Sequence, residues 1–305
     1  MKIFLTGATG LLGRYFIESD SASGKHEILG LSKTLHDGLG LASAVRVVAM
    51  PFESREGVRD LLQRFSPDWV IHAGGEGNVD RVENEPARFS SINLEFPLFL
   101  MEESWKLRAR WVTFSSNGIY GGDRAPYSET SLPRPINAYG RFKAEVDAQT
   151  RGYPGHWVIF RPTISYGWNY RFGRANPVTF FLPRMQQGNE LSLVDDQFEN
   201  PVYAGDVATV LWRVIEDGFQ GELNVGGGDF RVSRYEWMRA VARAFGYDQN
   251  RISPARLAEF PNSALRPRDT SFDTRKLVAE LGARPLDVYA GALQMKADAR
   301  RGHEP

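Results

Sequence analysis

Short apolar runs alternate with amphipathic segments along the first half of the chain, and this alternation predicts strands and helices in turn. Apolar runs bounded by glycine or polar residues are typical of buried parallel strands. We predict such strands at residues 3–5, 27–31, 45–49, 68–75, 110–114 and 157–160. Between them, helical periodicity predicts an amphipathic helix at 58–65, a helix over 93–105 that tolerates Pro97 near its start, and a helix opening at Asn137.

The composition shifts after residue 163. Residues 166–184 interleave aromatic residues with arginines, which suits either stacking on a base and pairing with phosphate or a packed lobe with a basic rim. Beyond them we predict strands at 191–194 and 223–225, and helices from Asp206, around 233–245 and at 274–281. The predicted class is therefore α/β: a doubly wound parallel sheet followed by a smaller C-terminal lobe.

Composition narrows the classes of partner. The 305 residues carry zero formal net charge, which argues against a protein built to hold nucleic acid or an anionic membrane. There is no cysteine, and the five histidines show no metal-type spacing, so we expect no metal and take His72 as a packed residue. No leader-like segment and no apolar run of about 18 residues is present, so we expect a cytoplasmic protein without a membrane span.

A glycine-rich string directly follows the first predicted strand and opens a helix. Gly7 permits a tight turn, Gly10 lets a diphosphate approach the backbone, and Gly13 lets the helix pack closely on the sheet. The helix N-terminus then offers free amides and a positive dipole end to an anion. This context predicts a Rossmann dinucleotide site, and a plain glycine turn is the alternative.

The end of the second strand indicates which dinucleotide is bound. An acidic residue there binds a ribose 2′-hydroxyl, whereas basic residues accept a 2′-phosphate. This chain has Ser32 and Lys33, and no carboxylate until Asp37. We therefore expect NADPH, with NADH as the alternative and with Arg14 as a second phosphate partner. The alternative for Lys33 is a merely solvated side chain.

Small and hydroxyl-bearing residues follow the next two strands. Ala73 and Gly74 leave room for a cofactor ribose or nicotinamide against the backbone. Ser115 and Ser116 follow the fifth strand, where a hydroxyl can hydrogen-bond a substrate carbonyl oxygen. The residue types of this stretch also favour a turn, so the alternative is a turn without a role in substrate binding.

Tyr139 and Lys143 lie four residues apart on a predicted helix and therefore share a face. A phenol titrates near a pKa of about 10, so acid–base work near neutrality needs a shift of about 3 units, or about 4 kcal/mol. A positive charge about 4 Å away at an effective dielectric of about 20 supplies roughly that much. We expect Lys143 to lower the pKa of Tyr139, and a solvated helix face is the alternative.

Together these motifs resemble the extended short-chain dehydrogenase/reductases over nearly the whole chain. The branch of most similar pattern is that of the dTDP-4-dehydrorhamnose reductases, which reduce a 4-keto-6-deoxy sugar on a nucleotide carrier with NADPH or NADH. The likeness is carried by residues 67–73, 78–86, 138–143, 194–197 and 266–274. It implies a Rossmann domain over 1–163, to which 201–227 returns, and a substrate-binding lobe over 164–200 and 228–305.

The resemblance also implies residue roles. Tyr139 is the acid that protonates the carbonyl oxygen, Lys143 lowers its pKa and holds the nicotinamide ribose, Ser116 orients the carbonyl, and Asn93 matches a proton-relay asparagine. The expected cofactor contacts are Gly7, Thr9, Gly10, Leu11, Leu12, Gly13, Ser32, Lys33, Ala73, Gly74, Tyr139, Lys143 and Arg161. The expected substrate contacts are Glu76, Asn117, Ile164, Trp168 and Arg266.

Departures from the family pattern leave alternatives open. Glu76 and Gly77 replace an aromatic and a hydroxyl residue, Pro51 stands where an aspartate often touches the adenine, and Ile164 stands where the sugar reductases often have tryptophan. One alternative is a nucleotide-sugar epimerase or dehydratase, although dehydratases usually have an acidic residue where this chain has Asn117. Another is a non-enzymatic NADP-binding regulatory subunit, similar to the beta subunit of methionine adenosyltransferase. The resemblance is also compatible with a homodimer.

Overall fold

A seven-stranded parallel sheet forms the centre of the larger part of the molecule. The computed structural model describes residues 1–21, 24–34, 43–261 and 264–299. The strand order is β11-β6-β5-β4-β1-β2-β3, and all neighbouring strands run parallel. The strands are β1 (Lys2–Thr6), β2 (Glu27–Ser32), β3 (Val45–Ala49), β4 (Trp69–His72), β5 (Arg110–Phe114), β6 (Trp157–Pro162) and β11 (Gly221–Val225).

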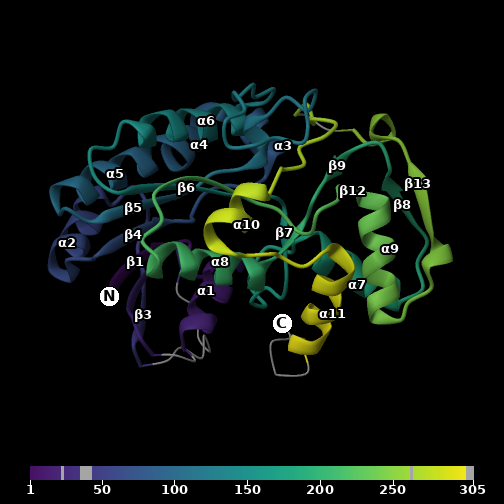
Figure 1. Ribbon diagram of the computed structural model, residues 1–305, viewed down its shortest axis with the longest axis horizontal. Helices are drawn as coiled ribbons and strands as arrows, with labels where there is room; N and C mark the ends of the chain where they lie inside the picture. The colour runs from purple at the N-terminus through teal and green to yellow at the C-terminus, as the bar shows by residue number, and fades with distance from the viewer. Residues whose placement is uncertain (22–23, 35–42, 262–263, 300–305) are drawn as a thin grey trace.

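Helices cover both faces of this sheet, because its strands are apolar on both sides. One face packs against α1 (Leu11–Ser21), α8 (Ala204–Glu216) and α10 (Arg275–Leu281), whose buried residues join one core cluster with the sheet. The other face carries α2 (Arg55–Phe65), α5 (Phe96–Lys106) and α6 (Ala138–Arg151) (Figure 1). Two short helices, α3 (Val79–Asn84) and α4 (Pro86–Ser90), precede α5.

The remaining elements build a smaller lobe with its own core. Its strands pair two by two: β8 (Leu191–Val194) with β13 (Ile252–Ala255), β9 (Phe198–Glu199) with β12 (Val232–Ser233), and β7 (Ser165–Tyr166) with β10 (Val202–Tyr203). The lobe's helices are α7 (Pro177–Gln186), α9 (Arg234–Phe245) and α11 (Val288–Asp298). Trp237, Met238 and Val241 of α9 are fully buried among them, so α9 is the central helix of the lobe (Figure 1).

The predicted fold class is confirmed. The helix expected over 93–105 is present, but its first turn, Ser91–Glu95, is π-helical, and α5 continues it from Phe96. Pro97 lies within the first two positions of α5, where its missing N–H is tolerated. Asn93 therefore lies inside a widened turn, a feature that is frequent at functional sites.

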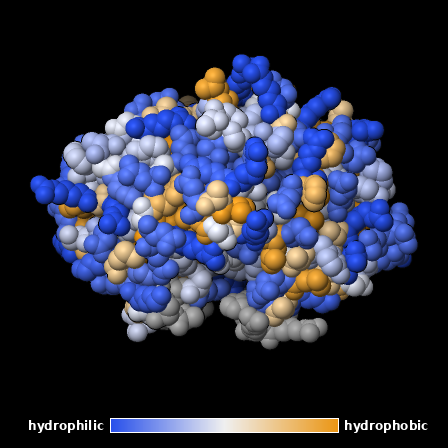
Figure 2. All heavy atoms as spheres, in the orientation of Figure 1, coloured by the Kyte–Doolittle hydropathy of each residue, from blue (hydrophilic) through white to orange (hydrophobic). Residues whose placement is uncertain are grey.

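The surface is mostly hydrophilic on the face shown in Figure 2, and its hydrophobic residues lie in small groups. Scattered apolar residues of this kind are ordinary on a folded protein. Within the ranges that the structure describes, no helix is both long and apolar enough to cross a lipid bilayer.

Candidate active site

A cleft of about 1230 Å³ lies where the strand order of the sheet reverses, between β1 and β4. Its wall includes Leu11 and Leu12 after β1, residues 73–80 after β4, and residues 114–118 at the end of β5. Ligands of doubly wound sheets bind at this switch point, outside the carboxyl ends of the strands. The lobe closes the other side with residues of α7, β8 and β9 and with residues from 257–260 and 266–270. The volume exceeds the roughly 300–1,000 Å³ of a usual single-ligand pocket.

The glycine string forms the turn between β1 and α1. Gly7 has φ +73°, and a Cβ there would lie 2.8 Å from the backbone of Ala73 and Gly74. A Cβ at Gly13 would overlap the carbonyl oxygen of Gly7, so the first turn of α1 packs directly on the loop. Both positions therefore need glycine, and Leu11 and Leu12 at the N-terminus of α1 line the cleft at the switch point.

The structure places Lys33 as we expected for a residue that selects the dinucleotide, but it does not place Arg14 so. Lys33 is exposed just beyond β2, and Ser32 is buried with its Oγ 2.6 Å from Thr9 Oγ1, which ties the glycine loop to that strand. Asp37 lies outside the described residues. Arg14 corrects our expectation: its guanidinium is buried, pairs with Glu18 at 2.7 Å, and donates to the carbonyl oxygens of Trp168 and Asn169.

Tyr139 and Lys143 project from the first turns of α6. Asn137 caps this helix by accepting a 2.8 Å hydrogen bond from Gly140 N. Lys143 Nζ donates a 2.7 Å bond to the carbonyl of Phe114 and lies 6.0 Å from the centre of the Tyr139 ring. Ser116 hydrogen-bonds Tyr139, and both line the cleft with Lys143. Strand β5 and helix α6 thus bring a hydroxyl, a phenol and an ammonium together.

The electrostatics of Tyr139 differ from what we expected. Burial raises the pKa of its phenol, while the hydrogen bond from Ser116 and the charge of Arg174 oppose that rise. Lys143 is directed to the Phe114 carbonyl rather than to the phenol oxygen, so the expected lowering by Lys143 does not dominate. The phenol is consequently protonated at neutral pH, which is the form that a general acid requires.

Lys143 is itself strongly perturbed. Burial lowers its pKa to about 8, and the nearby Asp147 carboxylate opposes that change. His72, at the end of β4, is buried and bonded to Thr6 Oγ1 at 2.8 Å. Burial, with the Lys143 charge, lowers the pKa of His72 to about 3, so this histidine is neutral and packed. Its expected structural role agrees with these contacts.

Asn93 clamps the segment after β4. Its Oδ1 accepts from Glu76 N at 2.9 Å, and its Nδ2 donates to Glu76 O at 3.1 Å. The π-helical turn therefore delivers a buried amide to the cleft and holds Glu76 beside it. The Glu76 carboxylate pairs with Arg81 at 2.6 Å and with Arg174 of the lobe at 3.5 Å, so it lies at the boundary between the two parts.

The lobe side of the cleft is polar near Ser116. Asn117 Nδ2 donates to Thr270 Oγ1 at 2.8 Å and to Glu199 Oε2 at 3.3 Å. Glu199 also accepts from the backbone N–H of Ile164 and pairs with Arg234 at 3.6 Å. Arg266 lines the same wall, with its guanidinium 2.5 Å from Asp80 of α3. Glu76, Asn117, Ile164 and Arg266 thus all reach the cleft.

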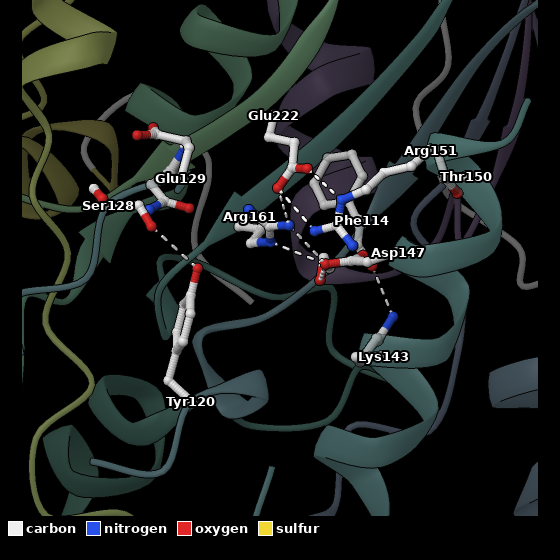
Figure 3. Close-up of polar contacts among 12 residues, drawn as sticks. Phe114, Tyr120, Ser128, Glu129, Lys143, Asp147, Thr150, Arg151, Arg161 and Glu222 are labelled. Carbon is white, nitrogen blue, oxygen red and sulfur yellow. Dashed lines mark hydrogen bonds and ion pairs between the residues drawn. The ribbon is translucent and has the colours of Figure 1, made fainter. Parts of the chain in front are cut away.

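Two expected site residues lie elsewhere. Arg161, on β6, is fully buried with its guanidinium between Asp147 and Glu222, and it is a structural cation rather than a cofactor contact (Figure 3). Trp168 packs into the lobe core and donates from Nε1 to the Met295 carbonyl at 2.7 Å. Neither side chain lines the cleft, because Arg161 pairs with two carboxylates and Trp168 bonds a backbone carbonyl within the protein.

Sequence reasoning missed Glu199, Thr270 and Arg234 in the cleft and Asp147 behind it. The first three come from separate segments of the lobe, and no local spacing connects them with Asn117. Asp147 carried a usable signal, because it follows Lys143 by four residues on the same helix face. No cluster of three or more potential metal ligands occurs among the residues that the structure describes.

Comparison with known proteins identifies relatives over nearly the full length. The family model described as "RmlD substrate binding domain" matches residues 1–299. A dTDP-4-dehydrorhamnose reductase of Mycolicibacterium smegmatis is 27% identical over 297 residues, covering 96% of this chain and 84% of that protein. Methionine adenosyltransferase 2 subunit beta of Bos taurus is 26% identical over 284 residues, covering 90% and 81%. The crystal structure of dTDP-4-dehydrorhamnose reductase from Bacillus anthracis in complex with NADP superposes with a TM-score of 0.85 at 22% identity, covering 97% and 99% of the two chains.

Proposed function

Because the chain belongs to the RmlD substrate binding domain family, we propose that it is an NADPH-dependent reductase of a nucleotide-linked 4-keto-6-deoxy sugar. The observation that carries the proposal is the convergence of Ser116, Tyr139 and Lys143 in one cleft at the switch point of the sheet. Similarity to a dTDP-4-dehydrorhamnose reductase over 96% of the chain agrees with that chemistry.

The loop between β1 and α1 fits a dinucleotide. Gly7 and Gly13 let the loop pack closely on the end of β4 and on the first turn of α1, and a loop without these side chains suits a diphosphate at the N-terminus of α1. Exposed Lys33 supports NADPH over NADH, since a cation at the end of β2 suits a 2′-phosphate. When bound, the reduced nicotinamide supplies the hydride.

The chain's own residues then handle the carbonyl oxygen. Tyr139, whose burial keeps it protonated, gives its proton to the oxygen as negative charge develops there. Ser116 donates a hydrogen bond that orients the carbonyl, and Lys143 adds positive charge from the next turn of α6. Asn93 holds the backbone at Glu76 and so shapes the wall beside the reacting carbon.

Replacement of Tyr139 by phenylalanine tests the proposal. We expect Tyr139→Phe to bind NADPH as the unchanged protein does and to lose about 10²–10⁴-fold in kcat, the usual contribution of a general acid. The measurement is NADPH oxidation with a 4-keto-6-deoxy sugar nucleotide, together with fluorescence titration of the cofactor. Tyr153→Phe is the matched control, because it removes a buried phenol whose oxygen bonds Ala109 O outside the cleft. Unchanged turnover in Tyr139→Phe would refute the assignment.

An epimerase or dehydratase that keeps its cofactor is the second enzymatic candidate. Such an enzyme shows no net consumption of added NADPH, whereas a reductase consumes one equivalent for each sugar reduced. The residue after Ser116 is Asn117 rather than an acid, which favours the reductase.

A non-enzymatic subunit is favoured by one specific observation. Methionine adenosyltransferase 2 subunit beta is 26% identical over 90% of this chain, nearly as similar as the reductase. Tight NADP binding without turnover of any keto-sugar nucleotide, together with a stable hetero-complex in co-purification, would support this alternative. The intact set of Ser116, Tyr139 and Lys143 ranks it below the reductase.

A further inference from the structure

Four side chains of α6 lie in one stripe, at every fourth residue: Tyr139, Lys143, Asp147 and Arg151. The first two line the cleft, and the other two do not. Asp147 is fully buried one turn beyond Lys143, in a position that the reaction described above does not use. A buried carboxylate so close to a reacting ammonium requires an explanation, since burying a charge is costly unless it is paired.

Three consecutive residues at the end of β5 each contact one side chain of this stripe. The Phe114 carbonyl accepts from Lys143 Nζ at 2.7 Å, the Ser115 hydroxyl donates to Asp147 Oδ2 at 2.8 Å, and Ser116 hydrogen-bonds Tyr139. These contacts fix the register between the helix that carries the acid and the strand that carries the orienting serine. A slip of either element would break all three contacts together.

Asp147 is held from the opposite side by an ionic chain (Figure 3). Arg161 Nε donates to Asp147 Oδ2 at 2.9 Å, and its Nη2 donates to Glu222 Oε2 at 2.5 Å. Glu222 also accepts from Arg151 at 2.5 and 3.1 Å, which returns the chain to α6. Asp147 Oδ1 and Arg161 Nη1 have no hydrogen-bond partner. The ionic chain is therefore present in the fold although not all of its buried polar atoms are satisfied.

We propose that Asp147, anchored by Arg161, is a positioning residue for the reduction: it holds Lys143 and Tyr139 of α6 opposite Ser116 of the β5 end. The inference rests on the proposed function. Its charge has a second consequence, because the carboxylate opposes the lowering of the Lys143 pKa by burial.

The groups that face Lys143 come from several elements. Asp147 and Tyr139 lie on α6, and the Phe114 carbonyl belongs to β5. His72 of β4 is neutral, since burial lowers its pKa to about 3. Arg161 of β6 and Glu222 of β11 lie behind Asp147. Asp147 is therefore the anion nearest to Lys143 along α6, and its removal lowers the pKa of Lys143 further below about 8.

The experiment compares Asp147→Asn, Asp147→Glu, Ser115→Ala and Arg151→Gln in the full chain. Steady-state kinetics from pH 6 to pH 10 give kcat and KM, and thermal unfolding shows that each variant is folded. The pKa of Lys143 is read directly by NMR of ¹³Cε-labelled lysine, with the resonance assigned from Lys143→Arg. This titration needs no turnover, so it remains informative if the proposed reaction is wrong. Absent turnover in the unchanged protein would count against the function, not against the link between Asp147 and Lys143.

Asp147→Asn should lose about 10-fold to 100-fold in kcat, the scale of a small misplacement of reacting groups, with KM nearly unchanged. Its Lys143 pKa should fall by about one pH unit, which moves the alkaline loss of activity to lower pH. Asp147→Glu should restore the Lys143 pKa but only part of kcat. Ser115→Ala, which keeps every charge, should lower kcat mildly with the same pH profile.

Arg151→Gln is the matched control, because it removes a cation of the same ionic chain that does not touch Asp147. We expect its kcat and its Lys143 pKa to be those of the unchanged protein. An equal effect of Arg151→Gln and Asp147→Asn would overturn the proposal, because the ionic chain would then act only on stability. An unaltered kcat and an unaltered Lys143 titration in folded Asp147→Asn would also overturn it. If Asp147→Asn does not fold, an unaltered kcat in Ser115→Ala decides against it.

Discussion

Glu199 brings a carboxyl to the wall of the cleft beside Asn117, and its chemistry makes a residue-scale prediction. The side chain is 17% exposed, accepts from Asn117 Nδ2 and pairs with Arg234. Glu199→Gln keeps the shape but removes the charge-assisted bonds, so we expect KM for the sugar nucleotide to rise about tenfold with kcat and NADPH affinity unchanged. Steady-state kinetics and cofactor titration measure these quantities.

The pH dependence of that KM gives a second readout. Burial raises the pKa of the Glu199 carboxyl, so it takes up a proton at a higher pH than an exposed glutamate would. As the pH falls, the unchanged protein should lose affinity for its substrate, whereas Glu199→Gln should show no such change. Glu190→Gln, an exposed carboxyl of the same lobe, is the control. A KM for Glu199→Gln equal to that of the control would contradict the assignment.

Single residues show where sequence reasoning succeeds and where it stops. Spacing on a helix correctly brought Tyr139 and Lys143 to one face, because helical geometry fixes it. Sequence could not say that Lys143 Nζ bonds the Phe114 carbonyl, and so the expected sign of the Tyr139 pKa shift was wrong. Arg161 and Trp168 were misplaced for the same reason: their partners, Asp147 and the Met295 carbonyl, are remote or unmarked in the sequence.

The cap of α6 connects an element's stability with the position of the acid two residues later. Asn137 is buried, accepts from Gly140 N at 2.8 Å, and donates to the Leu265 carbonyl at 3.0 Å. Asn137→Ala loses the cap and leaves a carbonyl unpaired, so we expect the free energy of unfolding to fall by about 1–3 kcal/mol. Because the first turn of α6 carries Tyr139, kcat should also fall. Urea unfolding and steady-state kinetics measure the two effects.

Asp287→Ala is the matched control for that prediction. Asp287 caps α11 in the lobe by accepting from Tyr289 N at 2.9 Å and Ala290 N at 2.8 Å, away from the cleft. It should cost a similar free energy of unfolding while kcat stays unchanged. Equal losses of kcat in both variants would mean that the cap acts on global stability alone.

At the scale of elements, apolar runs predicted the sheet well because its strands are buried on both faces. The strands expected at 45–49, 110–114 and 191–194 are observed with these bounds. Helices α7 and α11 were not predicted, because aromatic residues in α7 and alanines in α11 obscure a polar face. The burial of these helices comes from packing within the lobe. The π-helical turn at Asn93 has no sequence signal, because the widening of a helix is set by tertiary contacts.

At the scale of the molecule, the order of the sheet follows from general rules. Parallel strands need crossover helices, and the reversal of strand order between β1 and β4 creates the crevice that receives the glycine loop. The lobe is less predictable, because its three two-stranded pairs join segments far apart in the chain. Glu199 and Thr270 contact Asn117 only through this long-range pairing. For this reason the sequence did not predict all the residues on the substrate side of the cleft.

Asp80 of α3, which lines the cleft, joins the two parts of the molecule. Its Oδ2 lies 2.5 Å from Arg266 Nη2, and its Oδ1 accepts from Ala264 N at 3.0 Å, so it anchors the 264–270 segment that lines the lobe side. Asp80→Asn removes the charge that positions Arg266, and we expect KM for the sugar nucleotide to rise about tenfold. NADPH affinity should not change, because the glycine loop lies on the other side of the cleft. Glu85→Gln breaks an exposed ion pair with Arg88 on the neighbouring helix and should leave KM unaltered. A parallel loss of NADPH affinity in Asp80→Asn, or a KM equal to that of Glu85→Gln, would show that the pair does not act on the substrate side.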